Sequence, residues 1–134
     1  MRQLDGTTFV SGQIRPQDVA QLKQQGITMI VNNRPDGEDP DQPRAADIEA
    51  AAEETGIAYR FVPIQRGIGP ADVECMQEAM AEAAGGKLLA FCRSGNRSAL
   101  AWAVARRDQG ASVEEIEQAA ARAGIDLAPV AHLL

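Results

Sequence analysis

The sequence contains only two cysteines and one histidine among its 134 residues. Cys75 and Cys92 lie in quite different segments, which is not the pattern of a disulfide framework, and a single histidine does not complete a usual zinc set with them. We therefore expect neither a disulfide scaffold nor a metal site, and no residue pattern calls for a cofactor.

Long apolar runs and blocks of positive charge are also missing. No apolar run approaches the roughly 18 residues needed to span a bilayer, and the polar start 1–8 has no signal-peptide core. The net charge is −6, so the electrostatic footprint of a nucleic-acid binder is absent. We expect a cytoplasmic protein with no membrane or nucleic-acid partner, and the sequence does not indicate an oligomeric state.

What remains is an ordinary globular composition, with 45% apolar and 24% charged residues, consistent with a single domain over 1–134. Extended and helical patterns alternate along the chain. Strands are expected at 9–10, 27–31, 58–64 and 87–91, and helices at 16–25, 44–55, 70–84, 96–109 and 112–124, with a short final helix in 126–134. Such alternation with short connections predicts an α/β fold, a mainly parallel sheet flanked by helices.

The strongest chemical signal is the loop Cys92-Arg93-Ser94-Gly95-Asn96-Arg97-Ser98, between a predicted strand and a predicted helix. A thiol near a helix N-terminus with cationic neighbours has its pKa lowered to roughly 3.5–7.5, which makes Cys92 the expected nucleophile. Gly95 allows a turn that points successive N–H groups inward, and such a nest binds oxyanions. Arg97 is expected to hold the anion with its planar fork.

The other residues of this loop are expected to shape the anion site. Ser94 and Asn96 line the cup, and Asn96 is suited to capping the helix. Ser98 is expected either to donate its hydroxyl to the sulfur or to cap the helix, whereas Arg93 fits both a solvent-facing and an anion-binding position. Cys75 falls on the predicted helix 70–84 and is expected to pack there.

These motifs resemble a known bacterial family. The segments 9–13, 31–38 and 91–98 together look like the phosphatase-like domain of beta-lactamase-hydrolase-like proteins, also described as a family of sulfur transferases. The resemblance spans nearly the whole chain and implies the dual-specificity-phosphatase fold, with the cysteine loop at the carboxyl edge of the sheet. It also implies that Arg34, in the proline-rich loop 32–43, belongs to the rim of the site.

Two departures from the phosphatase pattern favour sulfur chemistry. Phosphatases of the cysteine class carry five residues between cysteine and arginine, but only four separate Cys92 from Arg97, as in the rhodanese-like loop of sulfurtransferases. The phosphatase general acid follows the strand corresponding to 58–64, where this chain has Gln65. Asp72 and, from the loop 32–43, Asp36 or Glu38 are the alternative acids.

We therefore expect a cysteine-dependent sulfurtransferase that forms a persulfide on Cys92 from thiosulfate or another sulfane-sulfur donor. The alternative is a phosphatase acting on a phosphate ester through a phosphocysteine intermediate. A second alternative is a non-enzymatic thiol sensor or anion-binding module, since sensors also use accessible cysteines of low pKa.

Overall fold

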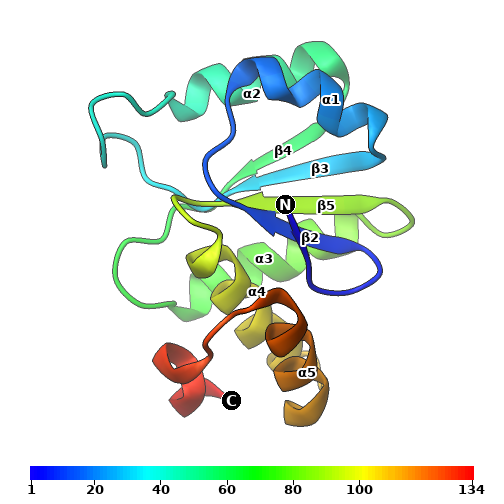
Figure 1. The fold of residues 1–134 in the computed structure, drawn as a ribbon, viewed down its shortest axis with the longest axis vertical. Helices are drawn as coiled ribbons and strands as arrows, with labels where there is room; N and C mark the ends of the chain where they lie inside the picture. The colour runs from blue at the N-terminus through cyan, green and yellow to red at the C-terminus, as the bar shows by residue number, and fades with distance from the viewer.

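The computed structural model describes residues 1–134 and contains one five-stranded sheet of order β1-β2-β5-β3-β4 (Figure 1). The strands are β1 (Arg2–Gln3), β2 (Thr8–Ser11), β3 (Ile27–Asn32), β4 (Ala58–Phe61) and β5 (Lys87–Phe91). Strands β2, β5, β3 and β4 pair in parallel, and only β1 is antiparallel. The predicted mainly parallel sheet is confirmed.

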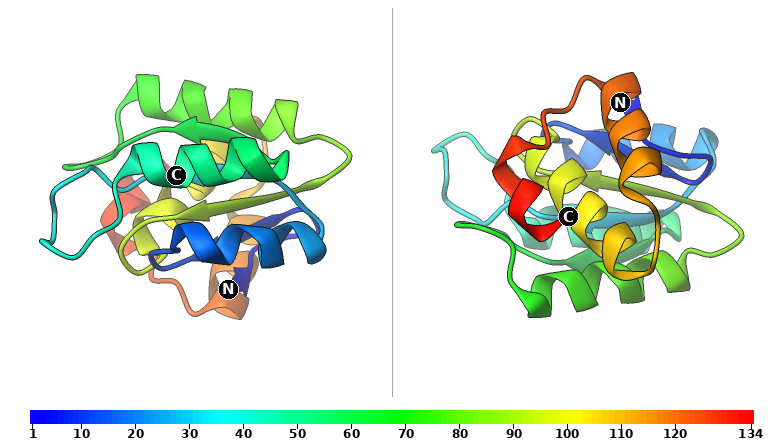
Figure 2. Two further views of the ribbon diagram at one scale, coloured as in Figure 1. Left: turned by 90° about the horizontal axis from the view of Figure 1, so that it is seen from above. Right: turned by 90° about the horizontal axis from the view of Figure 1, so that it is seen from below.

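Helices cover both faces of this sheet, as expected for buried parallel strands. They are α1 (Val19–Gln24), preceded by the 3-10 turn Pro16–Asp18, then α2 (Ala45–Thr55), α3 (Pro70–Glu82), α4 (Asn96–Asp108), α5 (Val113–Ala123) and the final 3-10 helix Ala128–Leu133. Helices α1 and α2 lie on one face, whereas α3, α4 and α5 lie on the other (Figures 1 and 2). None of these helices combines the length and hydropathy required to cross a bilayer.

Strand β5 divides its side chains between two apolar clusters, because successive residues of a strand point to opposite faces. Leu88 and Ala90 belong to the larger cluster, shared with α3, α4 and α5, whereas Leu89 and Phe91 belong to the smaller one beneath α1 and α2. Both faces of the central strand are therefore buried, and the residue that follows Phe91 is held rigidly at the end of the strand.

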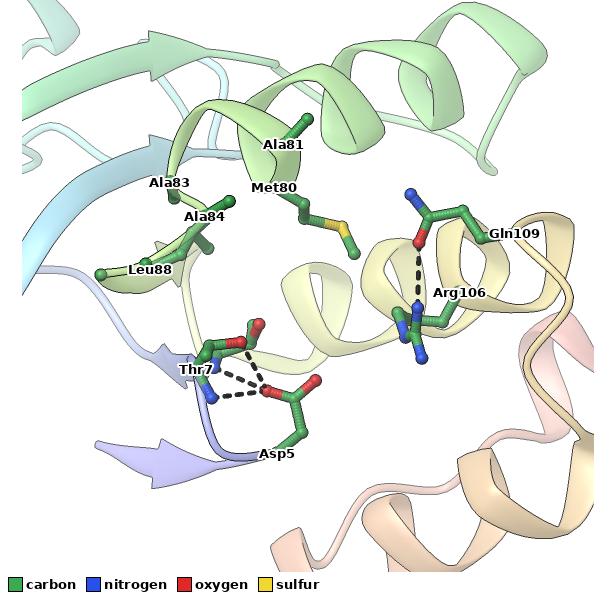
Figure 3. Close-up of a pocket in the computed structure, with 12 residues that line it drawn as sticks. Asp5, Thr7, Met80, Ala81, Ala83, Ala84, Leu88, Arg106 and Gln109 are labelled. Atoms are coloured by element: carbon green, nitrogen blue, oxygen red, sulfur yellow. Dashed lines mark hydrogen bonds between the residues drawn. The ribbon is translucent and has the colours of Figure 1, made fainter.

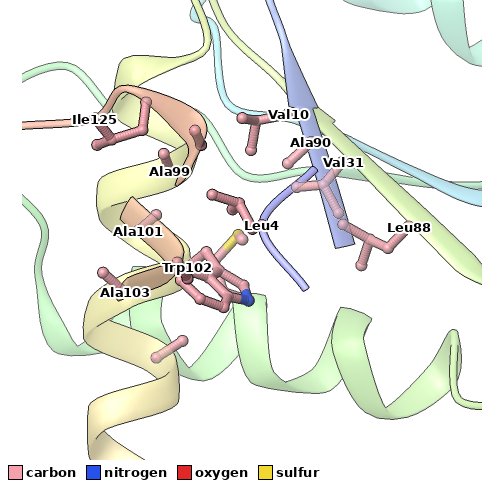
Figure 4. Close-up of a cluster of buried hydrophobic side chains, with 14 of the residues drawn as sticks. Leu4, Val10, Val31, Leu88, Ala90, Ala99, Ala101, Trp102, Ala103 and Ile125 are labelled. Carbon is pink, nitrogen blue, oxygen red and sulfur yellow. The ribbon is translucent and has the colours of Figure 1, made fainter. Parts of the chain in front are cut away.

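Helix α4 is packed into the larger cluster by small side chains. Ala99, Ala101 and Ala103 are almost fully buried beside Trp102 (Figure 4). Every residue of the segment 99–105 except the partly buried Leu100 is buried, so α4 is a central helix of the domain. The packing also fixes the N-terminus of α4, where the cysteine loop enters the helix.

Three expectations differ from the structure. Strand β1 was not predicted, since two polar residues are too few to show a periodicity. The strand expected at 58–64 ends at Phe61, opposite Asn32, the last residue of its only partner β3. The N–H groups of Val62 and Ile64 still donate to the carbonyls of Asn32 and Asn33, at 2.8 and 3.0 Å. Cys75 is exposed rather than packed.

Candidate active site

The carboxyl ends of the parallel strands meet at one edge of the sheet. Phe91 lies opposite both Ser11 and Asn32, which end β2 and β3. The loop 32–43 and the connection after β5 therefore emerge side by side (Figure 1). Ligands bind at this edge in open α/β folds, and Cys92 is the first residue beyond β5.

The cysteine sulfur accepts a main-chain hydrogen bond from its own loop. The N–H of Gly95 lies 3.1 Å from Cys92 Sγ, and Gly95 is the residue that precedes the first turn of α4. Gly95 has a φ of +96°, and an added Cβ would lie 3.2 Å from the carbonyl carbon of Ser11. Glycine is therefore required both by the left-handed backbone and by the close approach of β2. Cys92 itself is only 1% exposed.

Arg97 lies beside this sulfur and is bound by a carboxylate from the loop 32–43. Its Nη1 and Nη2 nitrogens each donate to Glu38 at 2.8 Å, and Nη1 also donates to the carbonyl of Ile64 at 2.8 Å. The pKa of Arg97 is raised, first by the hydrogen bonds to Glu38 and to a smaller extent by its proximity to Cys92. Arg97 thus connects the sulfur to Glu38.

Arg34 is a buried component of the same network. Its guanidinium donates to Glu38 at 3.0 Å, to Asp39 at 2.7 Å and to the side-chain oxygen of Gln13 at 3.0 Å. Glu38 therefore bridges two arginines, and the pKa of its carboxyl is lowered to about 2, mainly by Arg97 and to a smaller extent by Arg34, against an opposing effect of burial. Glu38 is ionised at neutral pH.

Ser98 neither donates to the sulfur nor caps α4, the two roles expected from the sequence. It is fully buried and donates its hydroxyl to Asn33 Oδ1 at 2.8 Å, so its proton points to β3 rather than to the sulfur, and the position before α4 is held by Gly95. Asn33 in turn donates to the carbonyl of Val62 at 2.9 Å. The two side chains tie the cysteine loop to the ends of β3 and β4.

The remaining loop residues are more exposed. Asn96 was expected to cap α4, but its side-chain oxygen instead accepts from Arg2 at 3.3 Å, and Arg2 also donates to the carbonyl of Ser94 at 3.1 Å. Arg93 is largely exposed, with Asp39 at 3.9 Å as its ionic partner. Arg2 was missed by sequence reasoning, because nothing in the sequence indicates that β1 reaches the loop.

Two of the three carboxyls expected as alternative acids, Asp36 and Asp72, cap helices. Asp36 accepts from the N–H of Ala45 at 2.8 Å, at the start of α2, and Asp72 accepts from the N–H of Gly69 at 2.9 Å, at the start of α3. Neither makes a hydrogen bond to the cysteine loop.

The site is distinct from a cavity at the opposite end of β5. That cavity, of about 470 Å³, is lined by Asp5, Thr7, Leu88, Arg106 and Gln109 among others (Figure 3). Leu88 lies near the start of β5, whereas Cys92 follows its end. No group of three or more His, Cys, Asp or Glu side chains is placed to hold a metal ion.

Together, the parallel sheet, its helical layers and a cysteine-arginine loop at the carboxyl edge define an α/β domain of the cysteine-phosphatase-like class. Human DUSP28 has the same fold, with a TM-score of 0.66 and 24% identity over 92% of this chain and 82% of that one. A phosphatase candidate from Neisseria meningitidis is more similar, with a TM-score of 0.79 and 34% identity over 96% of this chain and 92% of that one.

Residues 1–109 match the family described as Beta-lactamase hydrolase-like protein, phosphatase-like domain, and the chain belongs to this family. The beta-lactamase hydrolase-like protein of Xylella fastidiosa is 36% identical over 120 residues, which are 88% of this chain. The same match covers only 28% of the Xylella protein, so the chain corresponds to one part of a longer relative. The family resemblance expected from the sequence is confirmed.

Proposed function

We propose that this chain is an enzyme in which the Cys92 thiolate takes a group from a small anionic substrate, with a phosphate ester as the leading candidate. The observation that carries the proposal is the N–H of Gly95 directed at the cysteine sulfur at 3.1 Å, with Arg97 two residues further on. Main-chain N–H groups at a helix N-terminus stabilise both a thiolate and a bound oxyanion. Membership of a phosphatase-like family supports phosphate over sulfur and reverses the order that the loop spacing alone favoured.

In the phosphatase reaction, Cys92 attacks phosphorus and the bond to the leaving oxygen breaks, with the electron pair departing on that oxygen. Water then hydrolyses the phosphocysteine and releases phosphate and the thiolate. A general acid that protonates the leaving oxygen typically contributes about 10²–10⁴ in rate. The three expected acids do not fill this role, because Asp36 and Asp72 cap helices and Glu38 is ionised and paired with Arg97. We therefore expect substrates whose leaving groups are stable anions, such as aryl phosphates, to react much faster than alkyl phosphates.

Sulfur transfer is the second candidate, and two observations favour it. The interval between Cys92 and Arg97 is four residues. The expected acids Asp36, Asp72 and Glu38 are all bound to other groups, and sulfur transfer needs no proton donor. Cys92 would attack the outer sulfur of thiosulfate, the sulfur–sulfur bond would break, and sulfite would leave with the electron pair. The product is a persulfide on Cys92, ready for an acceptor thiolate.

Parallel turnover assays distinguish these chemistries. The wild-type chain is compared with Cys92→Ser and with Cys75→Ser, which removes the other, exposed cysteine. Phosphate release from an aryl phosphate, lost only in Cys92→Ser, supports the leading proposal. Thiocyanate formation from thiosulfate and cyanide with the same dependence supports the second, and the absence of both activities leaves an anion-binding or thiol-sensing role.

A further inference from the structure

Glu38 occupies the part of Arg97 that is expected to hold the substrate anion. Its two carboxylate oxygens accept from the two Nη nitrogens of Arg97, both at 2.8 Å. This paired geometry is the one in which arginine holds carboxylates and phosphates. A substrate oxyanion therefore cannot make the same contact while Glu38 remains in place.

The burial of the nucleophile also indicates that the site is closed to substrate in this conformation. Cys92 is 1% exposed, and Arg97 lies beside it, held between Glu38 and the carbonyl of Ile64. Release of Arg97 by Glu38 therefore frees an anion-binding group that lies next to the nucleophile.

The loop that carries Glu38 is held by its own side chains. The N–H groups of Glu38 and Asp39 donate to the side-chain oxygen of Gln42 at 3.1 and 3.3 Å, and the amide nitrogen of Gln42 donates to the carbonyl of Pro35 at 2.8 Å. Because the main chain is held in this way, we infer that Glu38 leaves Arg97 through a rotation of its side chain, during which Arg34, which also donates to Glu38 at 3.0 Å, remains available as its partner. The exchange does not require the loop to unfold.

We propose that Glu38 is an internal anion which the substrate displaces from Arg97, and that this competition determines which anions bind. The proposal rests on the proposed function in one respect, the binding of the substrate anion by Arg97. A tetrahedral oxyanion presents two oxygens to Arg97 and further oxygens to the N–H groups of the cysteine loop. A simple carboxylate gains no contact that Glu38 does not already make, so the site selects tetrahedral oxyanions over carboxylates.

The proposal is tested by calorimetric titration of the full chain with orthophosphate and, separately, with acetate. When a binding-competent state is only partly populated, the apparent dissociation constant rises in inverse proportion to its population. Glu38→Gln removes the competing charge and is expected to bind orthophosphate at least about tenfold more tightly, by the same relation. Acetate is expected to bind detectably only after this substitution.

Asp41→Asn is the matched control, since Asp41 is an exposed carboxylate of the same loop and Arg97 donates to Glu38 rather than to it. Its affinity for orthophosphate should equal that of the wild type. Glu38→Ala, which also removes the hydrogen-bonding group, should tighten binding as Glu38→Gln does, and thermal melting shows whether each variant is folded. Unchanged or weaker binding in both folded Glu38 variants overturns the proposal and makes Glu38 a support for Arg97.

Turnover assays and orthophosphate binding together distinguish a failure of the proposed function from a failure of the proposed competition. If the chain turns over neither aryl phosphate nor thiosulfate, but Glu38→Gln still binds orthophosphate more tightly, the competition holds and the enzymatic role does not. If turnover depends on Cys92 but the Glu38 variants bind orthophosphate as the wild type does, only the competition fails.

Discussion

Replacing Gly95 by alanine tests whether the cysteine loop has the conformation described. The left-handed backbone, with φ of +96°, costs a residue with a Cβ about 1–2 kcal/mol. The added Cβ also lies 2.8 Å from Nη2 of Arg2 and 3.2 and 3.3 Å from the carbonyl carbon and oxygen of Ser11, so the Arg2 side chain and the backbone of the loop or of β2 must move. Overpacking of this kind typically costs about 1–3 kcal/mol, which places the total loss near 2–5 kcal/mol.

Gly110 provides the control, because its φ is +99° and an added Cβ there has nothing within 4 Å. Gly110→Ala therefore shares the backbone cost without the contact, and urea unfolding should show Gly95→Ala to be less stable by about 1–3 kcal/mol. Turnover should also fall about 100-fold in Gly95→Ala alone, since small misplacements of reacting groups have effects of that size. Equal stability and equal turnover in the two variants would refute the described loop.

Three further predictions concern the groups around the loop. Ser98→Ala leaves the buried oxygen of Asn33 without its donor and should lower the free energy of unfolding by about 1–3 kcal/mol in urea; an unchanged value would mean that this bond is not formed. Because the pKa of Glu38 is lowered from its ordinary 4.5 to about 2, mainly by Arg97, ionised Glu38 stabilises the fold above pH 4.5, and this contribution is lost as the pH falls towards 2. Unfolding measured between pH 5 and 2 should thus show a shallower decline in Glu38→Gln, and identical curves would contradict the pairing. Arg2→Met removes the hydrogen bonds that Arg2 donates to Ser94 and Asn96 of the cysteine loop. It should lower kcat more than it raises KM, and Arg2→Lys should restore part of the loss. An unchanged kcat would exclude a positioning role for Arg2.

Most of the fold follows from local patterns in the sequence. The β-branched and apolar run 27–31, the strand 87–91 and the glycine that ends α2 at position 56 all mark elements that the structure contains. What escaped prediction depends on distant parts of the chain. Strand β1 is formed by two polar residues that gain their structure only by pairing with β2.

In the candidate site, too, the local features could be predicted from the sequence and the long-range contacts could not. The strand-loop-helix context of Cys92 and the conformational role of Gly95 follow from neighbouring residues. The pairing of Glu38 with Arg97 joins residues 59 positions apart, and the contact of Arg2 with Ser94 spans 92 positions. Such contacts are determined by the order of the strands and not by any local motif, as is the direction of the Ser98 hydroxyl.

Intact-mass spectrometry after brief incubation with an aryl phosphate or with thiosulfate tests most directly whether Cys92 receives the transferred group. We predict a phosphoryl group or one additional sulfur atom on the wild-type chain and on Cys75→Ser, located to the peptide that contains Cys92, and no such adduct on Cys92→Ser. An unmodified wild-type chain with both donors, during turnover of either one, would contradict the account.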